Sequence, residues 1–427
     1  MDIAPAASLR GALRVPGDKS ISHRALLVGA VCDSPTIVRG FGRSLDTEST
    51  IAAVRSLGVS VEEDEPDVLK VHGLGLSGLH EPETPIDCGN AGTLARLLPG
   101  LLAGQEGRRF ELTGDDSLRA RPMDRVAAPL SEMGAHVETT DGRLPLRIEG
   151  SSLAGIEHEP DVASAQVKSC VLLAGLLAEG RTTVVEPVPT RDHTERMLRA
   201  AGARLTAKGS RISIERAERL DLGEVDVPGD FSATAPFVVA ATLLPGSELI
   251  LQGVSVNPSR TGLLDALERM GARIAVFNRR TQSGEPVADL EVTHAELVAT
   301  EIVPADVPRT IDELPLFALA ASMARGTSRV RGAAELRAKE SDRIDSVATA
   351  LRAVGARVRP TSDGYSIRGV PARPRGGEID AAGDHRVAIA GAVAGVVSQE
   401  GVRVRGADAA AVSFPGFYEL LDSLASR

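Results

Sequence analysis

Five segments of this 427-residue chain share one pattern. An amphipathic, helix-like stretch ends in a small or apolar residue and a glycine, and a strand-like run follows. The glycine suits the position just after a helix, where left-handed backbone is favoured, and the next residues suit a strand. An Ala-, Leu- and Val-rich run with its own glycine turn and strand pattern precedes each segment, and one further run of this kind, at 389–397, follows the last segment. The five segments are residues 56–61, 132–137, 200–205, 269–274 and 353–358.

The recurrence predicts a unit of helix, strand, helix and strand that is repeated six times at about seventy residues each. We expect the Ala-rich first helices, such as 171–180 and 237–246, to be buried on all sides. The second helices, such as 261–270, are expected to be amphipathic. Val-Pro-Gly-Asp opens the first and fourth units, at residues 15–18 and 227–230. These two copies either are merely similar turns or divide the chain into two halves of three units.

Composition restricts the function. The net charge of −10, 2% aromatic residues and no tryptophan argue against a nucleic-acid binder, which needs neutralised phosphates and stacking platforms. The three cysteines, Cys32, Cys88 and Cys170, form no CxxC pair, which indicates a reducing compartment and no zinc site. Residues 1–16 lack the apolar core of a signal peptide, and no apolar run approaches membrane-spanning length. A cytoplasmic protein without a membrane partner is expected.

The start of the first apolar helix concentrates polar residues. A Pro-Gly turn is followed by Lys19, Ser20, Ser22 and Arg24. We expect Ser20 or Ser22 to cap the helix. A helix N-terminus attracts anions, and an Arg fork can hold phosphate or carboxylate by two bonds. The alternative is an ordinary solvated surface.

Polar clusters also open most of the other predicted helices, and each has an ordinary structural explanation as a helix cap or a surface ion pair. Pro122 is expected at the first position of a helix that runs to Met133. If all these helix starts face one cleft, that cleft binds anions and also holds Asp312 and Glu340. The clusters are residues 88–93, 112–124, 163–169, 190–195, 309–315, 336–343 and 384–386.

Only five of the 48 Lys and Arg residues are Lys, so lysine is scarce in this chain. A Lys in a chain that otherwise uses Arg is a candidate for a specific task. Three of the five, Lys19, Lys168 and Lys339, fall in the polar clusters, whereas Lys70 and Lys208 do not.

The chain resembles the 5-enolpyruvylshikimate-3-phosphate (EPSP) synthase family, the 3-phosphoshikimate 1-carboxyvinyltransferases, over nearly its whole length. The resemblance implies an α/β fold, an inverted α/β barrel-like arrangement of six βαβαββ units with three in each of two domains. It places residues 1–17 and 229–427 in one domain and residues 18–228 in an inserted second domain. The motifs that carry it are Pro-Gly-Asp-Lys-Ser-Ile-Ser-His-Arg (16–24), Gly-Asn-Ala-Gly-Thr (89–93), Leu-Arg-Ala-Arg-Pro-Met (118–123), Ser-Ala-Gln-Val-Lys-Ser (164–169), Lys-Glu-Ser-Asp-Arg (339–343) and Asp-His-Arg (384–386).

The resemblance also implies the reaction. Family members transfer the enolpyruvyl group of phosphoenolpyruvate to the 5-hydroxyl of shikimate 3-phosphate and release phosphate through a tetrahedral intermediate. It implies these two small-molecule substrates, no cofactor, no metal, no nucleic-acid partner and a monomer. The family also binds the herbicide glyphosate in the phosphoenolpyruvate pocket, and Gly92, which has no Cβ, leaves room for it.

The resemblance assigns roles to individual residues, several of which serve more than one role. The expected catalytic residues are Lys19, Asp312 and Glu340. The residues expected to bind shikimate 3-phosphate are Lys19, Ser20, Arg24, Ser164, Ala165, Gln166, Thr190, Asp312 and Lys339. The residues expected to bind phosphoenolpyruvate are Lys19, Asn90, Gly92, Arg121, Gln166, Arg343 and Arg386.

Three positions depart from the family pattern. His193 stands where some relatives have Tyr, Glu335 where some have Asn, and residues 411–415 lack a Lys that some relatives carry. Two alternatives remain. The related UDP-N-acetylglucosamine enolpyruvyl transferase has a reactive Cys at the position of Asp116. A non-catalytic repeat scaffold would not need charged residues at its helix starts.

Overall fold

The structure, a computed structural model, describes residues 1–426, and the chain separates into two compact units. Unit 1 consists of Met1–Pro16, Pro228–Thr281 and Pro286–Arg427, and unit 2 of Gly17–Val227 and Gln282–Glu285. The chain passes from one unit to the other after residues 16 and 227, in each case one residue before the expected domain boundary. The four residues 282–285, expected with unit 1, group with unit 2 because they contact its helices and strands.

Unit 2 contains three four-stranded sheets with the same connectivity, in which the first two strands in spatial order are parallel and the other pairs antiparallel. The first sheet has the order β14 (Glu224–Asp226), β3 (Thr36–Arg39), β5 (Val68–His72), β4 (Ser60–Glu65). The second is β6 (Ile86–Asp87), β7 (Arg109–Thr113), β9 (Arg143–Glu149), β8 (His136–Thr140). The third is β10 (Glu157–His158), β11 (Arg181–Val185), β13 (Arg211–Glu215), β12 (Leu205–Lys208).

The helices of unit 2 fall into the two expected classes. The buried helices are α1 (Lys19–Gly29), α3 (Gly92–Leu102) and α6 (Ala165–Gly175), and their apolar side chains form the core of the unit. The more exposed helices are α2 (Leu45–Ser56), α4 (Asp116–Arg119), α5 (Asp124–Glu132) and α7 (His193–Ala200). The chain order β6–α3–β7–α5–β8–β9, apart from the short α4, is repeated by β10–α6–β11–α7–β12–β13, which confirms the βαβαββ unit.

Unit 1 also contains three sheets. The largest has the order β16 (Arg273–Gln282), β17 (Glu285–Thr293), β15 (Glu248–Ser255), β2 (Ser8–Leu13), β24 (Ala425–Ser426). The second is β18 (Glu301–Ile302), β19 (Gly326–Val330), β21 (Gly364–Gly369), β20 (Arg357–Thr361), and it repeats the connectivity of unit 2. The third is β1 (Asp2–Ile3), β23 (Val402–Arg405), β22 (Gly377–Asp380).

Three buried helices form the centre of unit 1: α8 (Phe231–Leu243), α11 (Leu314–Ser322) and α13 (His385–Val397). Every residue of α8 is buried, as predicted for the first helix of a unit. The outer helices are α9 (Gly262–Arg269), α10 (Val307–Thr310), α12 (Arg343–Ala353) and α14 (Phe417–Leu424). Short 3₁₀ turns are η1 (Pro304–Asp306), η2 (Ile311–Glu313), η3 (Ala334–Ala338) and η4 (Ala407–Val412).

The recurring glycine closes the outer helix of five units. In every case its φ lies between +91° and +112°, and the N–H of the following residue reaches back to a carbonyl five residues earlier. This is the Schellman termination, in which left-handed backbone turns the chain from helix to strand. The pairs are Val59 with Val54, Ala135 with Leu130, Ala203 with Leu198, Ala272 with Leu267 and Ala356 with Leu351.

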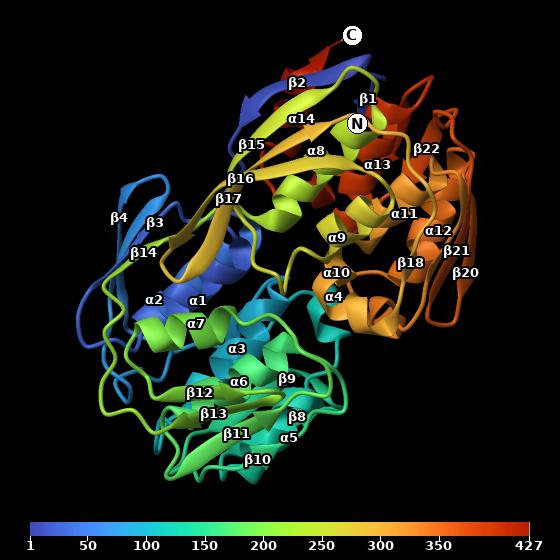
Figure 1. Ribbon diagram of the computed structural model, residues 1–427. Coiled ribbons are helices and arrows are strands. Elements are labelled where there is room, and N and C mark those ends of the chain that lie inside the picture. Colours follow the sequence, from blue (N-terminus) through green and yellow to red (C-terminus); the bar gives the residue numbers. More distant parts are fainter. Residues whose placement is uncertain (427) are drawn as a thin grey trace. The chain divides into compact units, whose positions relative to one another are not determined.

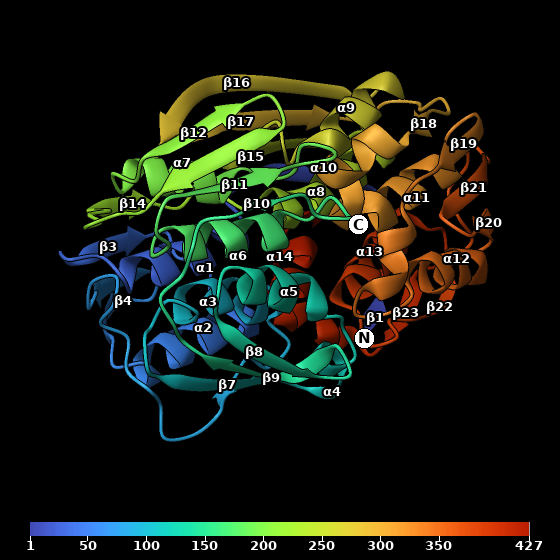
Figure 2. The ribbon, with the colours of Figure 1, turned by 90° about the horizontal axis from the view of Figure 1, so that it is seen from below.

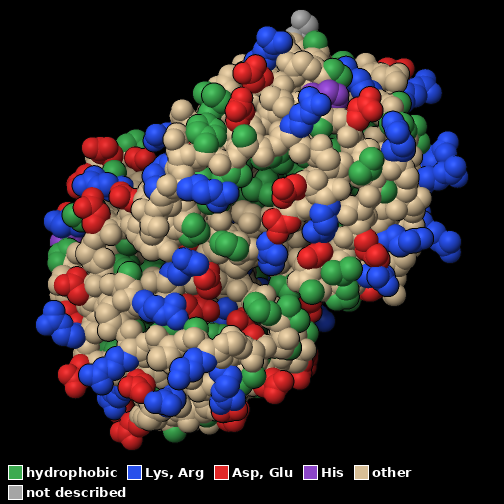
Figure 3. Space-filling view, in the orientation of Figure 1, with side chains coloured by type: hydrophobic (Ala, Val, Ile, Leu, Met, Phe, Trp, Pro, Cys, Tyr) green, Lys and Arg blue, Asp and Glu red, His purple; other side chains and the backbone are tan. Residues whose placement is uncertain are grey.

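The surface carries both signs of charge. On the face shown in Figure 3, Lys and Arg side chains are interspersed with Asp and Glu rather than gathered in one patch. Within residues 1–426, no helix combines the length and the apolar character that crossing a membrane requires.

Two of the buried helices of unit 2 approach each other closely. Figures 1 and 2 both show α3 and α6 side by side. Gly100 of α3 faces the backbone of Cys170 in α6, and a Cβ added to Gly100 would lie 2.2 Å from the Cys170 carbonyl oxygen. The glycine therefore sets the distance between the two helices.

We predict that Gly100→Ala lowers the free energy of unfolding by about 1–3 kcal/mol, because a backbone carbonyl cannot move aside as a side chain can. Denaturant titration measures the change. The matched control is Gly391→Ala in α13, whose added Cβ would meet only the side chains of Ile379 and Val404, at 3.2 Å. Equal losses in the two variants would show that the α3–α6 approach is not constrained in this way.

Candidate active site

The expected site residues fall into two groups, one in each unit. In unit 2, helix α1 begins at Lys19, and its cap is Asp18, whose carboxylate accepts a hydrogen bond of 2.9 Å from the Ile21 amide. The expectation that Ser20 or Ser22 caps this helix was wrong, because both residues lie inside it. Ser22 instead accepts a hydrogen bond from the Gly42 amide. Capping by Asp18 leaves Lys19 and Ser20 in the first turn.

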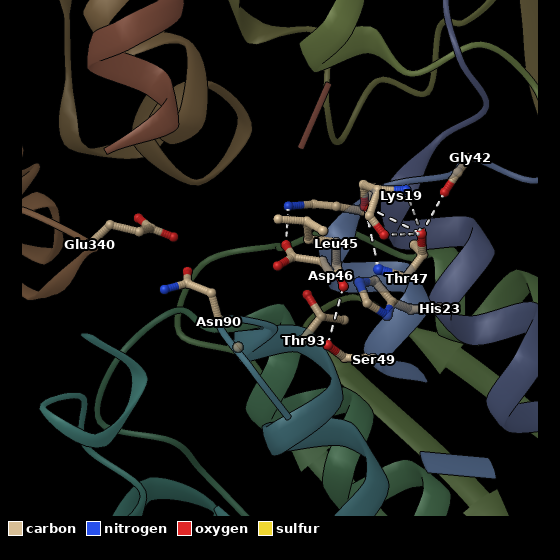
Figure 4. A network of polar contacts seen from close by, with 12 residues as sticks. Lys19, His23, Gly42, Leu45, Asp46, Thr47, Ser49, Asn90, Thr93 and Glu340 are labelled. Carbon is tan, nitrogen blue, oxygen red and sulfur yellow. Dashed lines mark hydrogen bonds and ion pairs between the residues drawn. The ribbon is translucent and has the colours of Figure 1, made fainter. Parts of the chain in front are cut away.

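Lys19 has a carboxylate partner that the sequence analysis missed. Its Nζ lies 2.6 Å from Oδ2 of Asp46 in the first turn of α2, as Figure 4 shows. Ser44 and Thr47 form a capping box around this turn and so fix the position of Asp46. The ammonium of Lys19 is thus placed by a neighbouring helix start before any substrate binds.

Arg24 is buried, and each of its three guanidinium nitrogens donates a hydrogen bond to a neighbouring group. Its Nε donates to Thr194 Oγ1 at 2.7 Å, its Nη2 to Ser169 Oγ at 3.1 Å and its Nη1 to the Ser20 carbonyl at 3.0 Å. Burial lowers the pKa of Arg24 to about 10, against the raising effect of Glu195, so the guanidinium remains charged at neutral pH. These contacts tie α1 to α6 and α7.

His23 is the neighbour of Arg24 in α1 and is also buried. Burial lowers its pKa well below the ordinary value, and the charges of Lys19 and Arg24 lower it further. The His23 ring bonds Thr50 Oγ1 through Nδ1, at 2.6 Å.

The turn before α3 holds the expected phosphoenolpyruvate residues Asn90, Gly92 and Arg121 together. Arg121 donates from Nη2 to Asn90 Oδ1 at 3.1 Å and to Ser117 Oγ at 3.2 Å, while Asn90 donates to Asp115 at 2.7 Å. Arg121 is only 7% exposed. Asn90 therefore lies between Arg121 and Asp115 and bonds both side chains.

Arg96 joins the starts of α3 and α6, and the sequence analysis missed it. Its Nη1 donates to Gln166 Oε1 at 3.0 Å, and Gln166 in turn donates to Thr93 Oγ1 at 3.2 Å. An Arg inside the apolar run of α3 is the signal that could have identified it, since a buried cation requires partners. Ser164 caps α6 by accepting from the Val167 amide, which leaves Ala165 and Gln166 in its first turn.

Thr190 and His193 lie near the start of α7. Thr190 donates to Glu186 Oε1 from its amide, at 3.0 Å, and from its hydroxyl. His193 is buried, and its Nδ1 lies 2.7 Å from Glu285 Oε1. The histidine that replaces the Tyr of some relatives is therefore bound to an internal carboxylate.

In unit 1, Arg343 is the centre of the expected site. It is 2% exposed and begins α12. Its guanidinium binds both oxygens of Asp384, at 2.8 and 3.2 Å, pairs with Glu340, and lies 3.6 Å from Asp312. The structure thus brings together two expected carboxylates, Asp312 and Glu340, around one buried arginine.

Further arginines flank this group. Arg260 lies 3.8 Å from Asp312 and 3.3 Å from Asp230, the cap of α8. Arg386, in the first turn of α13, lies 3.8 Å from the buried Glu313. The sequence analysis had singled out the segments that contain Glu313 and Asp384 but assigned neither residue a role, and it did not consider Arg260.

Asp384 and Arg343 stabilise each other's charge. Burial would raise the pKa of the Asp384 carboxyl, but Arg343 lowers it, and the net shift is downward. Burial would lower the pKa of Arg343, but Glu340, Asp384 and Asp312 together raise it above its ordinary value. Asp384 also accepts from the Arg386 amide at 2.8 Å as the cap of α13.

The remaining expectations are met only in part. Lys339 follows η3 and is half-buried. Arg337 pairs with Asp342 and Asp345 at the surface, so the salt-bridge explanation holds for part of the segment 336–343.

The expectation that Pro122 opens a helix was wrong, because α5 begins two residues later, at Asp124. No three His, Cys, Asp or Glu side chains within residues 1–426 are arranged to hold a metal ion.

Comparison with known proteins identifies the family. The family model described as EPSP synthase (3-phosphoshikimate 1-carboxyvinyltransferase) matches residues 3–421. The chain belongs to the EPSP synthase family. A 3-phosphoshikimate 1-carboxyvinyltransferase of Geobacter sp. (strain M21) is 48% identical over 427 residues, which cover 100% of this chain and 99% of the relative. One from Synechococcus sp. (strain WH7803) is 49% identical over 424 residues, covering 98% of this chain and 96% of the relative.

Solved structures agree with this assignment to the EPSP synthase family. The EPSP synthase of Acinetobacter baumannii has a TM-score of 0.88 and 41% identity, covering 99% of this chain and 97% of that chain. The enolpyruvyl transferase NikO of Streptomyces tendae has a TM-score of 0.80 at 20% identity, covering 99% of this chain and 96% of that chain, and it supports the fold alone. These comparisons confirm the two-domain α/β fold of the EPSP synthase family. They favour this family over the two alternatives, a UDP-N-acetylglucosamine enolpyruvyl transferase and a non-catalytic repeat scaffold.

We predict that Asp384→Asn lowers the free energy of unfolding at pH 7 by about 3 kcal/mol, because it removes one partner of a buried ion pair. The pKa of Asp384 is lower in the folded state than in the unfolded state, where it is about 3.9. The Asp384 charge therefore stabilises the fold above that pH, and this stabilisation is lost as the pH falls through the folded pKa. The difference between wild type and variant should therefore shrink below about pH 4. Denaturant titrations from pH 3 to 8 measure this.

The matched control for that experiment is Asp342→Asn, which changes another aspartate helix cap whose ion-pair partner, Arg337, is more exposed. A loss below about 1 kcal/mol is expected there, because Asn still caps the helix and an exposed ion pair contributes little. A difference for Asp384→Asn that does not vary with pH would contradict the role of its charge.

Proposed function

We propose that this chain transfers the carboxyvinyl group of phosphoenolpyruvate to the 5-hydroxyl of shikimate 3-phosphate and releases phosphate. The observation that carries the proposal is the Arg343 group, in which Asp312 and Glu340 flank a buried guanidinium in a member of the EPSP synthase family. Two carboxylates with different surroundings suit a reaction that needs two separate proton transfers.

The reaction requires one addition and one elimination. The 5-hydroxyl oxygen attacks C2 of phosphoenolpyruvate and loses its proton, while C3 gains a proton, which gives a tetrahedral intermediate. C3 then loses a proton as the C2–O bond to phosphate breaks. In this proposal Asp312 accepts the hydroxyl proton, and Glu340 serves the proton transfer at C3 together with Lys19.

Binding is assigned to the cations and helix starts described above. We assign shikimate 3-phosphate to the starts of α1 and α6, with Arg24 and Thr190, and with Lys339 in unit 1. Phosphoenolpyruvate is assigned to Asn90, Gly92 and Arg121. Asn90 accepts hydrogen bonds from both Arg121 and the Gly92 amide, which supports a common ligand. Gln166 and Lys19 would contact both substrates, and Arg343 and Arg386 would stabilise charge on the leaving phosphate.

The chain is further proposed to act as a monomer in the cytoplasm without a cofactor or metal. The three cysteines are free and buried, as is common in a reducing compartment.

We predict that Asp312→Asn and Glu340→Gln each reduce turnover by about 10²–10⁴-fold, because each removes a general acid or base. Phosphate release measures turnover, and calorimetric titration with shikimate 3-phosphate checks that binding persists. The matched control is Asp345→Asn, an exposed carboxylate that pairs with Arg337, and it should retain wild-type turnover. Near-normal phosphate release in both test variants would remove these carboxylates from the mechanism.

We predict that glyphosate inhibits the wild type in competition with phosphoenolpyruvate, and that Gly92→Ala weakens glyphosate more than substrate. A Cβ added to Gly92 would lie 3.0 Å from Arg96 Nη1 and 3.1 Å from Arg121 Nη1. The guanidinium groups must then shift, so the KM for phosphoenolpyruvate should also rise. The inhibition constant of the longer glyphosate should rise by about tenfold more, as 1–3 kcal/mol of crowding would produce.

Steady-state assays of both forms, with phosphoenolpyruvate and glyphosate varied together, test this. A wild type that is already insensitive, or an Ala variant with an unchanged ratio of inhibition constant to KM, would contradict the steric role of Gly92.

A further inference from the structure

A buried group of charges lies behind the start of α6, and no step of the proposed reaction uses it. Lys168, in the middle of α6, is 1% exposed. Its Nζ lies 3.1 Å from Glu186 Oε1 and 2.6 Å from Glu195 Oε1. Glu186 follows β11 and Glu195 belongs to α7, so one ammonium joins three segments of unit 2.

This charge group contacts residues assigned to shikimate 3-phosphate. Glu186 Oε1 accepts both the amide and the hydroxyl of Thr190. On the other side, Arg24 donates to Ser169 and Thr194, the chain neighbours of Lys168 and Glu195. Lys168 therefore lies between the supports of two substrate-binding side chains.

The balance of charge explains why these supports need a lysine. Glu186 and Glu195 are 8% and 3% exposed, and two carboxylates so little hydrated are costly without a cation. Lys168 contacts both carboxylates directly, and the charge of Glu195 also acts on the buried Arg24. Removal of Lys168 would leave the carboxylates to repel each other or to move toward water, and Thr190 would move with Glu186.

We propose that Lys168 is a positioning residue for shikimate 3-phosphate: its ammonium holds Glu186 and Glu195, and these hold Thr190 and the surroundings of Arg24 in the arrangement that receives the substrate. The identity of the substrate rests on the proposed function. The dependence of Thr190 on Lys168 does not, and it can be measured separately.

The first experiment compares kinetic constants of wild type and Lys168→Met, which keeps the length of the side chain and removes its charge. The KM for shikimate 3-phosphate should rise about tenfold or more, as is common when a supporting residue behind a ligand is lost. The kcat and the KM for phosphoenolpyruvate should change much less. Equal rises in both KM values would overturn the proposal, since a general loss of structure acts on both substrates.

The second experiment uses no substrate. The Thr190 amide is bonded to Glu186 Oε1, so its hydrogen exchange reports whether Glu186 keeps its place. Exchange at Thr190 should become faster in Lys168→Met, whereas amides in the middle of α3 stay protected. Unchanged exchange at Thr190 would overturn the proposal. A wild type without activity on shikimate 3-phosphate would refute the proposed function and leave this measurement decisive for the positioning role.

Two further variants separate charge from packing. In Lys168→Met/Glu186→Gln the net charge is balanced again, and the Gln oxygen can still accept from Thr190, so the KM for shikimate 3-phosphate should return toward the wild-type value. If Lys168→Met alone does not fold, this double variant is assayed by itself, and a KM raised equally for both substrates counts against the proposal.

Val171→Ala changes a buried position one turn along α6, and it should reduce stability without changing one KM selectively. A selective change there would also count against it.

Discussion

A helix that is buried on every side still has backbone N–H groups at its start that need polar partners. In this chain α1, α8 and α13 are capped by Asp18, Asp230 and Asp384, and α6 by Ser164. Asp18 and Asp230 are the final residues of the two Val-Pro-Gly-Asp copies. Because the rest of each helix is packed in an aliphatic core, the helix starts are the places where charged side chains can enter, and the candidate site is built there.

The cations at these helix starts are paired within the protein itself. Arg343 is surrounded by Asp312, Glu340 and Asp384, and Lys19 is bound to Asp46. A buried cation without such partners would be costly. In the proposed reaction, an anionic substrate shares each cation with a carboxylate already in place, which limits its affinity but keeps the cations oriented when the transition state forms. Asp384 serves both needs, because one carboxylate caps a helix and holds an arginine.

Local signals explain what the sequence could predict. The glycine terminations and the apolar runs act over a few residues, so the repeated unit and its buried helices could be derived without tertiary information. Details that depend on distant partners could not. Asp18, rather than Ser20 or Ser22, caps α1, and the Ser22 hydroxyl instead accepts from the Gly42 amide, twenty residues away in the chain. Arg96 of α3 reaches the start of α6 through Gln166, which is seventy residues away in the chain.

The choice between lysine and arginine follows from the geometry of the carboxylates. Scarcity alone did not identify a function, since Lys208 is exposed and Lys70 pairs loosely at the surface with Glu62, at 3.5 Å. Arg343 holds both oxygens of Asp384 and still reaches Glu340, which requires a planar fork. Lys168 contacts one oxygen on each of two glutamates from within a helix, in a space with almost no access to water. A compact ammonium fits that space, and a guanidinium would have to displace one of the two carboxylates that it neutralises.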